Sequence, residues 1–551
     1  MDTSMKKNIL PFLLLFASYG YIQAGSLKGI ENNRDTVTIL SYNDFHGAFI
    51  AGQNVPGAAL FVQALLNEKA RSPHPVILSV GDNFSGSYFS LMTKGEPHEV
   101  FTSPVEGAKV ISAIGNHEFD WGTDYLIKNS SRYFNYIAAN VREKTNGKRI
   151  VPPCAMVSVP VFGSTDILKI GIIGLTTTET ATGGKYQYVS RLTFDAPTQE
   201  YVQVLCDSLR KKEQADMVVV LMHIATSMKD GKPCITESDA KGITRVKGID
   251  AIVSGHSHEV VIGEIDGIPV IQAGKNGELI GKLTFQVAKE QKKLRLTYLK
   301  GDLINVGENS LIKAKIDSCI SIYELYSIYT KADTDLIHDR KDRNHYTQMG
   351  ALVTASYVQA YQSACQKNSN LPKFPVIGVN HFNGIRAGIK KGDVTKSDIG
   401  NVLPLGGTLG AFRMTGKEVK ELFTEGRRTT GSTAIEKRGF LQSSNMKLVI
   451  KKEKDKEVVS HLYYLTDGAK AEYKEIFDND EYIVVCDDFI STGGDEYPDK
   501  YFKNHRVEAF DGEIVNALLT YLKEQKQIPN SKATTPEVEP ERNPIPSRIT
   551  Y

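Results

Sequence analysis

The sequence has few cysteines, and no two of them form a Cys-x-x-Cys pair. The six are Cys154, Cys206, Cys234, Cys319, Cys365 and Cys486. Their wide spacing argues against a zinc site built from cysteine. Because the number is even, disulfides are permitted, but a protein of this size does not need them. Cys206 and Cys486 lie in apolar segments, which favours buried thiols at these two positions.

The chain also lacks a strong net charge, an internal repeat and a long apolar run in its body. Its 66 Lys and Arg residues nearly balance 64 Asp and Glu, and a formal charge of +2 does not predict a surface that binds nucleic acid polymers. No run beyond the N-terminus reaches the about 18 apolar residues that a membrane-spanning helix needs. We therefore expect no stable membrane span, and the length of 551 residues predicts roughly two to four domains.

The N-terminus has the layout of a secretory signal peptide. Lys6 and Lys7 precede an apolar stretch at residues 9–17, and small residues follow around Ala24. We expect residues 1–24 to be a signal peptide and the protein to be exported to a periplasm, a cell surface or the medium. An uncleaved anchor is the alternative interpretation.

Five short segments carry side chains that commonly bind metal ions, and each segment follows an apolar run. The candidate ligands are Asp44, His46, Asp82, Asn116, His223, His256 and His258. The apolar runs lie at residues 36–40, 75–80, 110–114, 217–222 and 249–253. Such short runs, rich in Val and Ile, are typical of strands buried on both faces. Because the ends of parallel strands meet at one edge of a sheet, the sequence predicts that these side chains converge there.

These residue types fit a two-metal hydrolytic centre. Two divalent ions about 3.5 to 4 Å apart can hold the attacking and the leaving oxygen of a displacement, and they lower the pKa of a bound water. A ligand set of Asp, Asn and His without Cys accepts several metals. We expect two ions, Zn or Mn, with Mg or Fe as alternatives. Each motif alone is common in turns, and His223 alone would be typical of a core histidine, so the interpretation depends on the context that the five segments share.

The motifs resemble those of the calcineurin-like metallophosphoesterases and, within them, the 5'-nucleotidase family. The resemblance implies one metal held by Asp44, His46 and His258, another held by Asn116, His223 and His256, and Asp82 as the bridge. It also implies that His117 stabilises charge on the phosphoryl group in the transition state, while Asp120 orients the imidazole of His117. The alternative for Asp120 is a helix cap.

Three later segments resemble the C-terminal domain of the same family. They are residues 379–386, 402–407 and 489–495. In the family this domain binds the nucleoside, and its arginines reach toward the phosphate side of the ligand. The matching positions here are Arg343 and Arg386. Phe489 is the candidate for base stacking and Asp495 for a polar contact, although ordinary core packing is the alternative for Phe489.

The remaining candidate residues are Asn380, His381, Phe382 and Leu405. The sequence departs from the family pattern at the last three of them. Leu405 stands where the family usually has the first of two aromatic rings that sandwich the base. His381 replaces an asparagine, and Phe382 replaces a glycine. Either His381 or Phe382 could supply the missing stacking face, or the pocket could prefer a different ligand.

These observations predict an α/β protein of two unrelated domains. We expect a four-layer α/β/β/α metallophosphoesterase sandwich at residues 33–308, a connecting helix and hinge at 309–336, a C-terminal α/β nucleotide-binding domain at 337–528, and a disordered tail at 529–551. The tail is rich in Pro, Glu, Ser and Thr. The resemblance implies that the domains rotate against each other, with the hinge near residues 333–339.

The function implied by the resemblance is that of an exported dinuclear-metal phosphohydrolase. It would release phosphate from nucleoside 5'-monophosphates by attack of a metal-bound water or hydroxide. The alternatives are a 2',3'-cyclic-nucleotide phosphodiesterase/3'-nucleotidase or a UDP-sugar hydrolase. A non-catalytic surface protein that binds nucleotides is a further alternative, which the complete ligand set argues against. The expected partner is a nucleotide substrate, and the sequence does not distinguish a monomer from a dimer.

Overall fold

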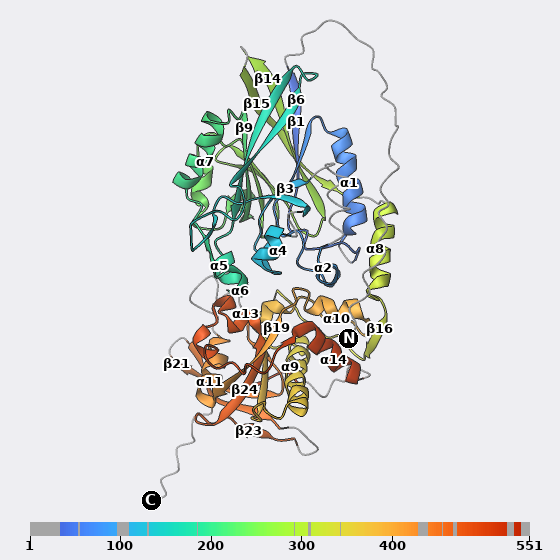
Figure 1. Ribbon diagram of the computed structural model, residues 1–551, viewed down its shortest axis with the longest axis vertical. Helices are drawn as coiled ribbons and strands as arrows, with labels where there is room; N and C mark the ends of the chain where they lie inside the picture. Colours follow the sequence, from blue (N-terminus) through green and yellow to red (C-terminus); the bar gives the residue numbers. More distant parts are fainter. Residues whose placement is uncertain are drawn as a thin grey trace, which may run out of the picture.

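The protein was analysed as a computed structural model in which two domains lie one above the other (Figure 1). The structure describes residues 34–52, 55–95, 109–128, 132–184, 186–290, 293–306, 310–341, 343–427, 439–453, 456–466, 471–525 and 534–540. The expected signal peptide at residues 1–24 lies outside these ranges. Within them, no helix is both long enough and apolar enough to cross a membrane. All six cysteines are described and are free thiols, and Cys206 and Cys486 are buried as predicted.

The N-terminal domain contains two sheets packed face to face. The described strands of the first sheet run in the order β15-β14-β1-β2-β3-β4 and span Lys293–Asn305, Leu279–Glu290, Arg34–Tyr42, Pro75–Ser79, Val110–Ala113 and Phe134–Ile137. Those of the second run β12-β13-β11-β9-β7-β6 and span Val260–Ile265, Ile268–Ala273, Ala251–Gly255, Met217–Lys229, Asp166–Thr176 and Cys154–Val161, with β10 (Lys232–Ile235) beside β9. Strands β1 to β4 pair in parallel, and so do β7, β9, β11 and β13. The carboxyl ends of the central strands of each sheet therefore meet at one edge.

Apolar side chains from both sheets form the core between them, including Val37, Leu78 and Val219. Helix α1 (Gly57–Arg71) covers the outer face of the first sheet, and α7 (Gln199–Lys211) covers that of the second (Figure 1). Both helices bury one apolar stripe against their sheet. The predicted four-layer α/β/β/α sandwich is therefore confirmed.

Short elements connect the layers of this domain. They are α2 (Tyr88–Thr93), η1 (His117–Phe119), α4 (Thr123–Lys128), β5 (Val141–Glu143), α5 (Thr180–Gly183), α6 (Tyr186–Val189), β8 (Leu192–Phe194) and η3 (Lys241–Arg245). In Figure 1, α2, α5 and α6 lie on the side of the N-terminal domain that faces the C-terminal domain.

The connection between the domains is a shorter helix than the sequence predicted. Helix α8 spans Ser310–Ile322 and runs along the side of the molecule between the two domains (Figure 1). Glu324 follows in a left-handed conformation with φ of 52°, which a continuous α-helix cannot contain. Residues Ile328–Ala332 then form β16, which pairs with β18 (Gly392–Thr395). The second half of the expected connector thus belongs to the C-terminal domain.

The C-terminal domain has a mixed central sheet with helices around it. Its described strands run in the order β20-β17-β24-β19-β25 and span Gln442–Ser443, Val376–Asn380, Glu481–Asp487, Thr408–Thr415 and Gly512–Glu513. The helices are α9 (Gln348–Lys367), η4 (Phe382–Gly384), α10 (Lys396–Val402), α11 (Gly416–Glu425), α13 (Asp488–Ser491), η5 (Gly494–Glu496), η6 (Asp499–Tyr501) and α14 (Ile514–Gln525). Thr395 with Asp398 begins α10 in a capping box, which fixes where this helix starts.

A second sheet of this domain includes part of the tail that the sequence predicted to be disordered. Its described strands run β23-β22-β21-β26 and span Tyr473–Glu475, Lys456–Leu465, Met446–Glu453 and Glu537–Pro540. Strand β26 pairs in parallel with β21, and the backbone N–H of Thr534 donates to the side chain of Asn445 at 3.0 Å. The open edge of β21 offers the hydrogen bonds that order this segment, despite its low apolar content. Residues 529–533 and 541–551 of the expected tail lie outside the described ranges.

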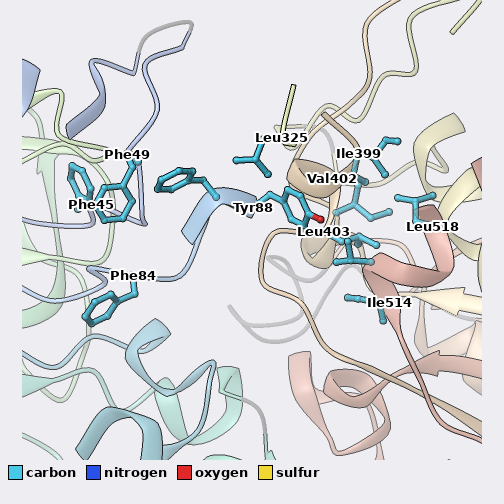
Figure 2. Packing of buried hydrophobic residues seen from close by; sticks show 14 of the residues in the cluster. Phe45, Phe49, Phe84, Tyr88, Leu325, Ile399, Val402, Leu403, Ile514 and Leu518 are labelled. Carbon is cyan, nitrogen blue, oxygen red and sulfur yellow. The ribbon is translucent and has the colours of Figure 1, made fainter. Parts of the chain in front are cut away.

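Tyr88 of α2 inserts into the C-terminal domain at the interface between the two domains. Its side chain is 2 % exposed and points toward Val402 and Leu403 (Figure 2). Its backbone N–H donates to the Asn401 side chain at 3.1 Å. The ring lies directly against Gly400, where an added Cβ would be 2.0 Å from Cγ of Tyr88. Only a residue without a side chain fits at that position.

We predict that Gly400→Ala destabilises the protein by about 1 to 3 kcal/mol, because the new methyl group forces the Tyr88 ring out of its site. Thermal melting measures the loss. The matched control is Gly52→Ala, since a Cβ there meets no atom within 4 Å. In a Tyr88→Ala background the cost of Gly400→Ala should shrink. An undiminished cost in that background would show that the ring is not what excludes the methyl group.

Candidate metal centre and substrate pocket

Turns that follow the central strands carry most of the candidate ligands. Asp44 and His46 follow β1, Asp82 follows β2, Asn116 follows β3, and His256 and His258 follow β11. His223 differs from the prediction because β9 continues past it to Lys229. It is nevertheless the last residue of β9 that pairs with β7, so it lies at the same edge as the other ligands.

Five of these residues adopt left-handed backbone conformations that are rare outside glycine. Their φ angles are 50° at Asp44, 51° at His46, 52° at Asp82, 78° at His256 and 62° at His258. Each such position costs on the order of 1 to 3 kcal/mol and persists only where the surrounding structure enforces it. Such conformations gather at functional sites, so the presence of five of them among the candidate ligands agrees with the ligand chemistry.

The first candidate metal group consists of Asp44, His46 and His258, whose ligand atoms lie within 4.8 Å of one another. Nδ1 of His46 lies 2.7 Å from the carbonyl oxygen of Ser85, which can only accept, so Nδ1 carries the proton. Nε2 of His46 then presents a lone pair 2.9 Å from Nε2 of His258. Two imidazole nitrogens at this distance fit a shared cation, and Asp44 supplies a carboxylate 3.4 Å from His258. This group equals the first ligand set that the resemblance implied.

The second candidate group consists of Asp44, Asp82 and His223. Nδ1 of His223 lies 2.9 Å from the carbonyl oxygen of Val80, which turns Nε2 toward Oδ2 of Asp82 and Oδ1 of Asn116, each at 3.2 Å. Asp44 belongs to both groups, and Oδ2 of Asp82 is also 3.7 Å from Nε2 of His46. The structure thus offers two carboxylates between the groups, where the sequence analysis named Asp82 alone.

His256 lies beside the second group without belonging to it. Its ring centroid is 5.1 Å from that of His223, and its backbone N–H donates to Oδ2 of Asp44 at 3.0 Å. Its Nε2 lies 3.3 Å from Oε2 of Glu179, a residue at the start of α5 that the sequence analysis did not consider.

The charges of the centre suit cations. Burial by itself would raise the pKa of Asp44, but a hydrogen bond from His258 and the charge of His223 hold that pKa below its usual range. Burial would also raise the pKa of Asp82, but the charges of His223 and His117 lower it below its usual range. Both carboxylates therefore remain negative although they are buried, which is the state a metal ligand needs.

His117 and Asp120 form a pair next to this centre. Nδ1 of His117 lies 2.8 Å from Oδ2 of Asp120, and the Ser85 hydroxyl donates to the same oxygen. Burial would lower the pKa of His117, but Asp120 and Asp82 together raise it. The pair is arranged so that Nε2 of His117 can present a proton to a ligand.

Glu118 is a residue whose role the sequence analysis missed. Its carboxylate is 4 % exposed and accepts the backbone N–H groups of Asp82, Asn83 and Gly115, each at 2.7 Å. It therefore joins the turn after β2 to the turn after β3. The sequence could have indicated this role, because Glu118 stands between His117 and the apolar Phe119. A charged side chain that is buried at such a position needs hydrogen-bond partners.

A cavity of about 280 Å³ connects the two domains beside the metal ligands. Its lining includes Asn116, His117 and Asp120 from the N-terminal domain, and Arg343, Asn380, His381, Arg386, Leu405, Phe489 and Asp495 from the C-terminal domain. A larger cavity of about 840 Å³ lies within the C-terminal domain, beside α9, and contains none of these residues. The candidate residues of both domains thus share the smaller cavity.

The pocket lining differs from the predicted one at Phe382, which is absent from it, and at Arg340, which the sequence did not suggest. Phe382 is fully buried, its ring centroid is 4.3 Å from that of His338, and it does not line the cavity. It therefore does not supply the missing stacking face. Arg340 does line the cavity, and its Nε has no hydrogen-bond partner among the described residues. Burial and the neighbouring Arg386 and Arg343 lower the pKa of Arg340 to about 9.

Comparison with known proteins agrees with this geometry. The family model of the calcineurin-like phosphoesterases matches residues 37–260, and that of the 5'-nucleotidase C-terminal domain matches residues 328–502. A 5'-nucleotidase of Vibrio cholerae serotype O1 is 24 % identical over 545 residues, covering 89 % of this chain and 91 % of that protein. A 2',3'-cyclic-nucleotide 2'-phosphodiesterase/3'-nucleotidase of Yersinia enterocolitica is 24 % identical over 404 residues, covering 65 % of this chain and 62 % of that protein.

A solved structure shares the fold. The crystal structure of a 5'-nucleotidase precursor from Thermus thermophilus matches with a TM-score of 0.68 at 24 % identity, and the match covers 92 % of this chain and 99 % of that one. Both domains are therefore shared in sequence pattern and in architecture. Taken with the ligand geometry at the strand ends, these matches show that the chain belongs to the 5'-nucleotidase family of metal-dependent phosphoric ester hydrolases.

Proposed function

We propose that this chain is an exported, dinuclear-metal phosphohydrolase that releases phosphate from nucleoside 5'-monophosphates. The observation that carries the proposal is the cavity between the domains, which His117 shares with Phe489 and Asp495. A nucleotide consists of a phosphate, a ribose and a base, and this cavity offers chemistry for each. Export rests on the signal-like sequence at residues 1–24.

The phosphate end of the ligand would lie between His117 and the arginines. The guanidinium groups of Arg343 and Arg386 line the cavity, and planar guanidinium groups bind phosphate oxygens in pairs. With Nδ1 of His117 directed at Asp120, its Nε2 is the atom that can donate a proton to a phosphoryl oxygen. The raised pKa of His117 favours the protonated ring, which stabilises developing negative charge.

The candidate ligands would hold two divalent ions at the same end. When bound, such ions activate a water molecule and neutralise charge on the phosphoryl oxygens. Asp44, His46, Asp82, His223 and His258 are grouped for this purpose, with Asn116 and His256 beside them. The mixed nitrogen and oxygen set suits Zn or Mn.

The nucleoside end would contact Phe489, Asp495 and Asn380. An aromatic face contributes about 1 to 3 kcal/mol to the binding of a stacked base. Asn380 is fully buried, and neither its Oδ1 nor its Nδ2 has a partner among the described residues, although it lines the cavity. A buried amide normally satisfies both atoms, so a ligand that bonds to it is the simplest explanation. The carboxylate of Asp495 can accept a ribose hydroxyl.

Two observations favour alternative substrates. Leu405 leaves one wall of the base site aliphatic, which suits a 2',3'-cyclic-nucleotide phosphodiesterase/3'-nucleotidase such as the Yersinia relative if base stacking matters less there. Arg340 adds a third guanidinium to the cavity, which suits the diphosphate of a UDP-sugar. Competition between these substrates and AMP separates the alternatives.

We predict that the purified chain, from residue 25 onward and with added Mn or Zn, releases phosphate from AMP and UMP faster than from 3'-AMP, 2',3'-cyclic AMP or UDP-glucose. His117→Ala should lower kcat by about 100- to 1,000-fold, because a group that stabilises charge in the transition state is removed. His461→Ala, which removes a histidine paired with Glu475 far from the cavity, serves as the control. Preference for cyclic or 3'-phosphates would assign the first alternative function.

Removal of the metal ions should abolish phosphate release, and Zn or Mn should restore it. We further predict that Asp44→Asn lowers the bound metal from about two ions per chain to fewer than about one, since Asp44 belongs to both candidate groups. Elemental analysis of the purified proteins measures the content directly. Asp302→Asn, a change in β15 outside both candidate groups, is the control. Retention of both ions by Asp44→Asn would contradict the assigned centre.

A further inference from the structure

His381 is a buried histidine held between two carboxylates at the wall of the cavity. Its Nδ1 lies 3.1 Å from Oδ2 of Asp495, its Nε2 lies 3.3 Å from Oδ2 of Asp487, and its side chain is nearly inaccessible. A neutral imidazole carries a single N–H, so only the doubly protonated ring can donate to both carboxylates. Burial would lower the pKa of His381, but Asp487 and Asp495 raise it to about 9.

Both carboxylates are themselves held in place. The other oxygen of Asp487 accepts the backbone N–H of Ile490 at 3.1 Å and so caps α13. The side-chain amide of Asn383 donates to Oδ2 of Asp495 at 3.3 Å. Asp495 has a left-handed φ of 50°, which requires support from its surroundings. The imidazole therefore lies in a fixed frame formed by β24, η4 and η5.

The same imidazole ring lies against the candidate base-stacking residue. The ring centroids of His381 and Phe489 are 4.5 Å apart, and the planes are tilted by 31°. Glycines fit closely on both sides of the pair, since an added Cβ would be 2.4 Å from Nε2 of His381 at Gly384 and 2.6 Å from the Phe489 ring at Gly494. Phe489 nonetheless stays half-buried and lines the cavity. His381 thus covers part of this ring, and the rest remains available to a ligand.

A second histidine and phenylalanine pair in the same domain gives an internal comparison. His338 stacks on Phe382 with centroids 4.3 Å apart and a tilt of 33°. Its nitrogens lie near the Thr347 hydroxyl and the carbonyl oxygen of Phe382, and burial lowers its pKa to about 4. Neither ring of this pair lines the cavity. Stacking alone therefore needs no carboxylates, whereas the two carboxylates at His381 keep its ring protonated.

We propose that His381 is a positioning residue that determines base specificity, because its imidazolium lies against Phe489 and makes the exposed part of that ring favour an electron-rich purine. A cation next to an aromatic ring attracts its π electrons, which leaves the remaining surface electron-poor. Leu405, also in the cavity lining, offers no π system, so the choice of base depends on Phe489. The inference rests on the proposed function and names purine nucleotides as the preferred class.

The test compares three substrates in the metal-loaded enzyme, from residue 25 onward. AMP carries a purine, UMP carries a pyrimidine, and ribose 5-phosphate carries no base. In His381→Asn, the kcat/KM of AMP relative to that of ribose 5-phosphate should fall about tenfold, equivalent to about 1.4 kcal/mol. The loss should appear in KM rather than in kcat, and the preference for AMP over UMP should fall as well. His338→Asn removes the comparison histidine and should leave both ratios at their wild-type values.

The outcomes below either support or overturn the role of His381. Unchanged ratios in a folded His381→Asn protein, or an equal fall in His338→Asn, would overturn the inference while nucleotide hydrolysis stands. If His381→Asn does not fold, Asp487→Asn replaces it, because an asparagine keeps the oxygen that caps α13 but removes one charge. The ratios should then fall severalfold, and unchanged ratios again overturn the inference. A wild-type enzyme without preference for AMP over ribose 5-phosphate would overturn the proposed function itself.

Discussion

Glu118 buries its carboxylate beneath the two turns that carry Asp82 and Asn116, and the candidate centre depends on this contact. Its hydrogen bonds to the backbone of Asp82, Asn83 and Gly115 fix the ends of β2 and β3 relative to each other. Asp82 in turn accepts the backbone N–H of His117 at 2.8 Å. In a buried site such hydrogen bonds strengthen one another. The left-handed conformation of Asp82 is therefore enforced by its neighbours, so its carboxylate is held in place before any ion binds.

The sequence was sufficient to locate this edge of the sheets because parallel strands buried on both faces have a clear signature. Each is a short apolar run with a polar residue where it stops, and four of the five segments follow this rule in the structure. His223 departs from it because β9 bends past the edge and continues into a pairing with β10. Periodicity shows that a strand exists but does not show where its pairing partner ends. The sequence therefore identified His223 as a candidate ligand but did not show its place within the strand.

What could not be predicted depended on contacts between distant segments. Glu324 ends the connecting helix through its backbone conformation, although the apolar spacing continues beyond it. Residues Glu537–Pro540 are ordered by the free edge of β21, which local composition cannot reveal. Phe382 packs against His338 and does not line the cavity, whereas Arg340 does. Packing across the domain decides which side chains reach the cavity, and the local sequence does not show this.

The contact between Tyr88 and Gly400 has a consequence for movement between the domains. The surface that the C-terminal domain presents to α2 consists partly of glycine backbone, since Gly406 lies under Leu91 much as Gly400 lies under Tyr88. A ring that is inserted beside backbone in this way must leave its site before the two surfaces can slide. A rotation of the kind implied by the family resemblance would therefore have to break the contact between Tyr88 and Gly400.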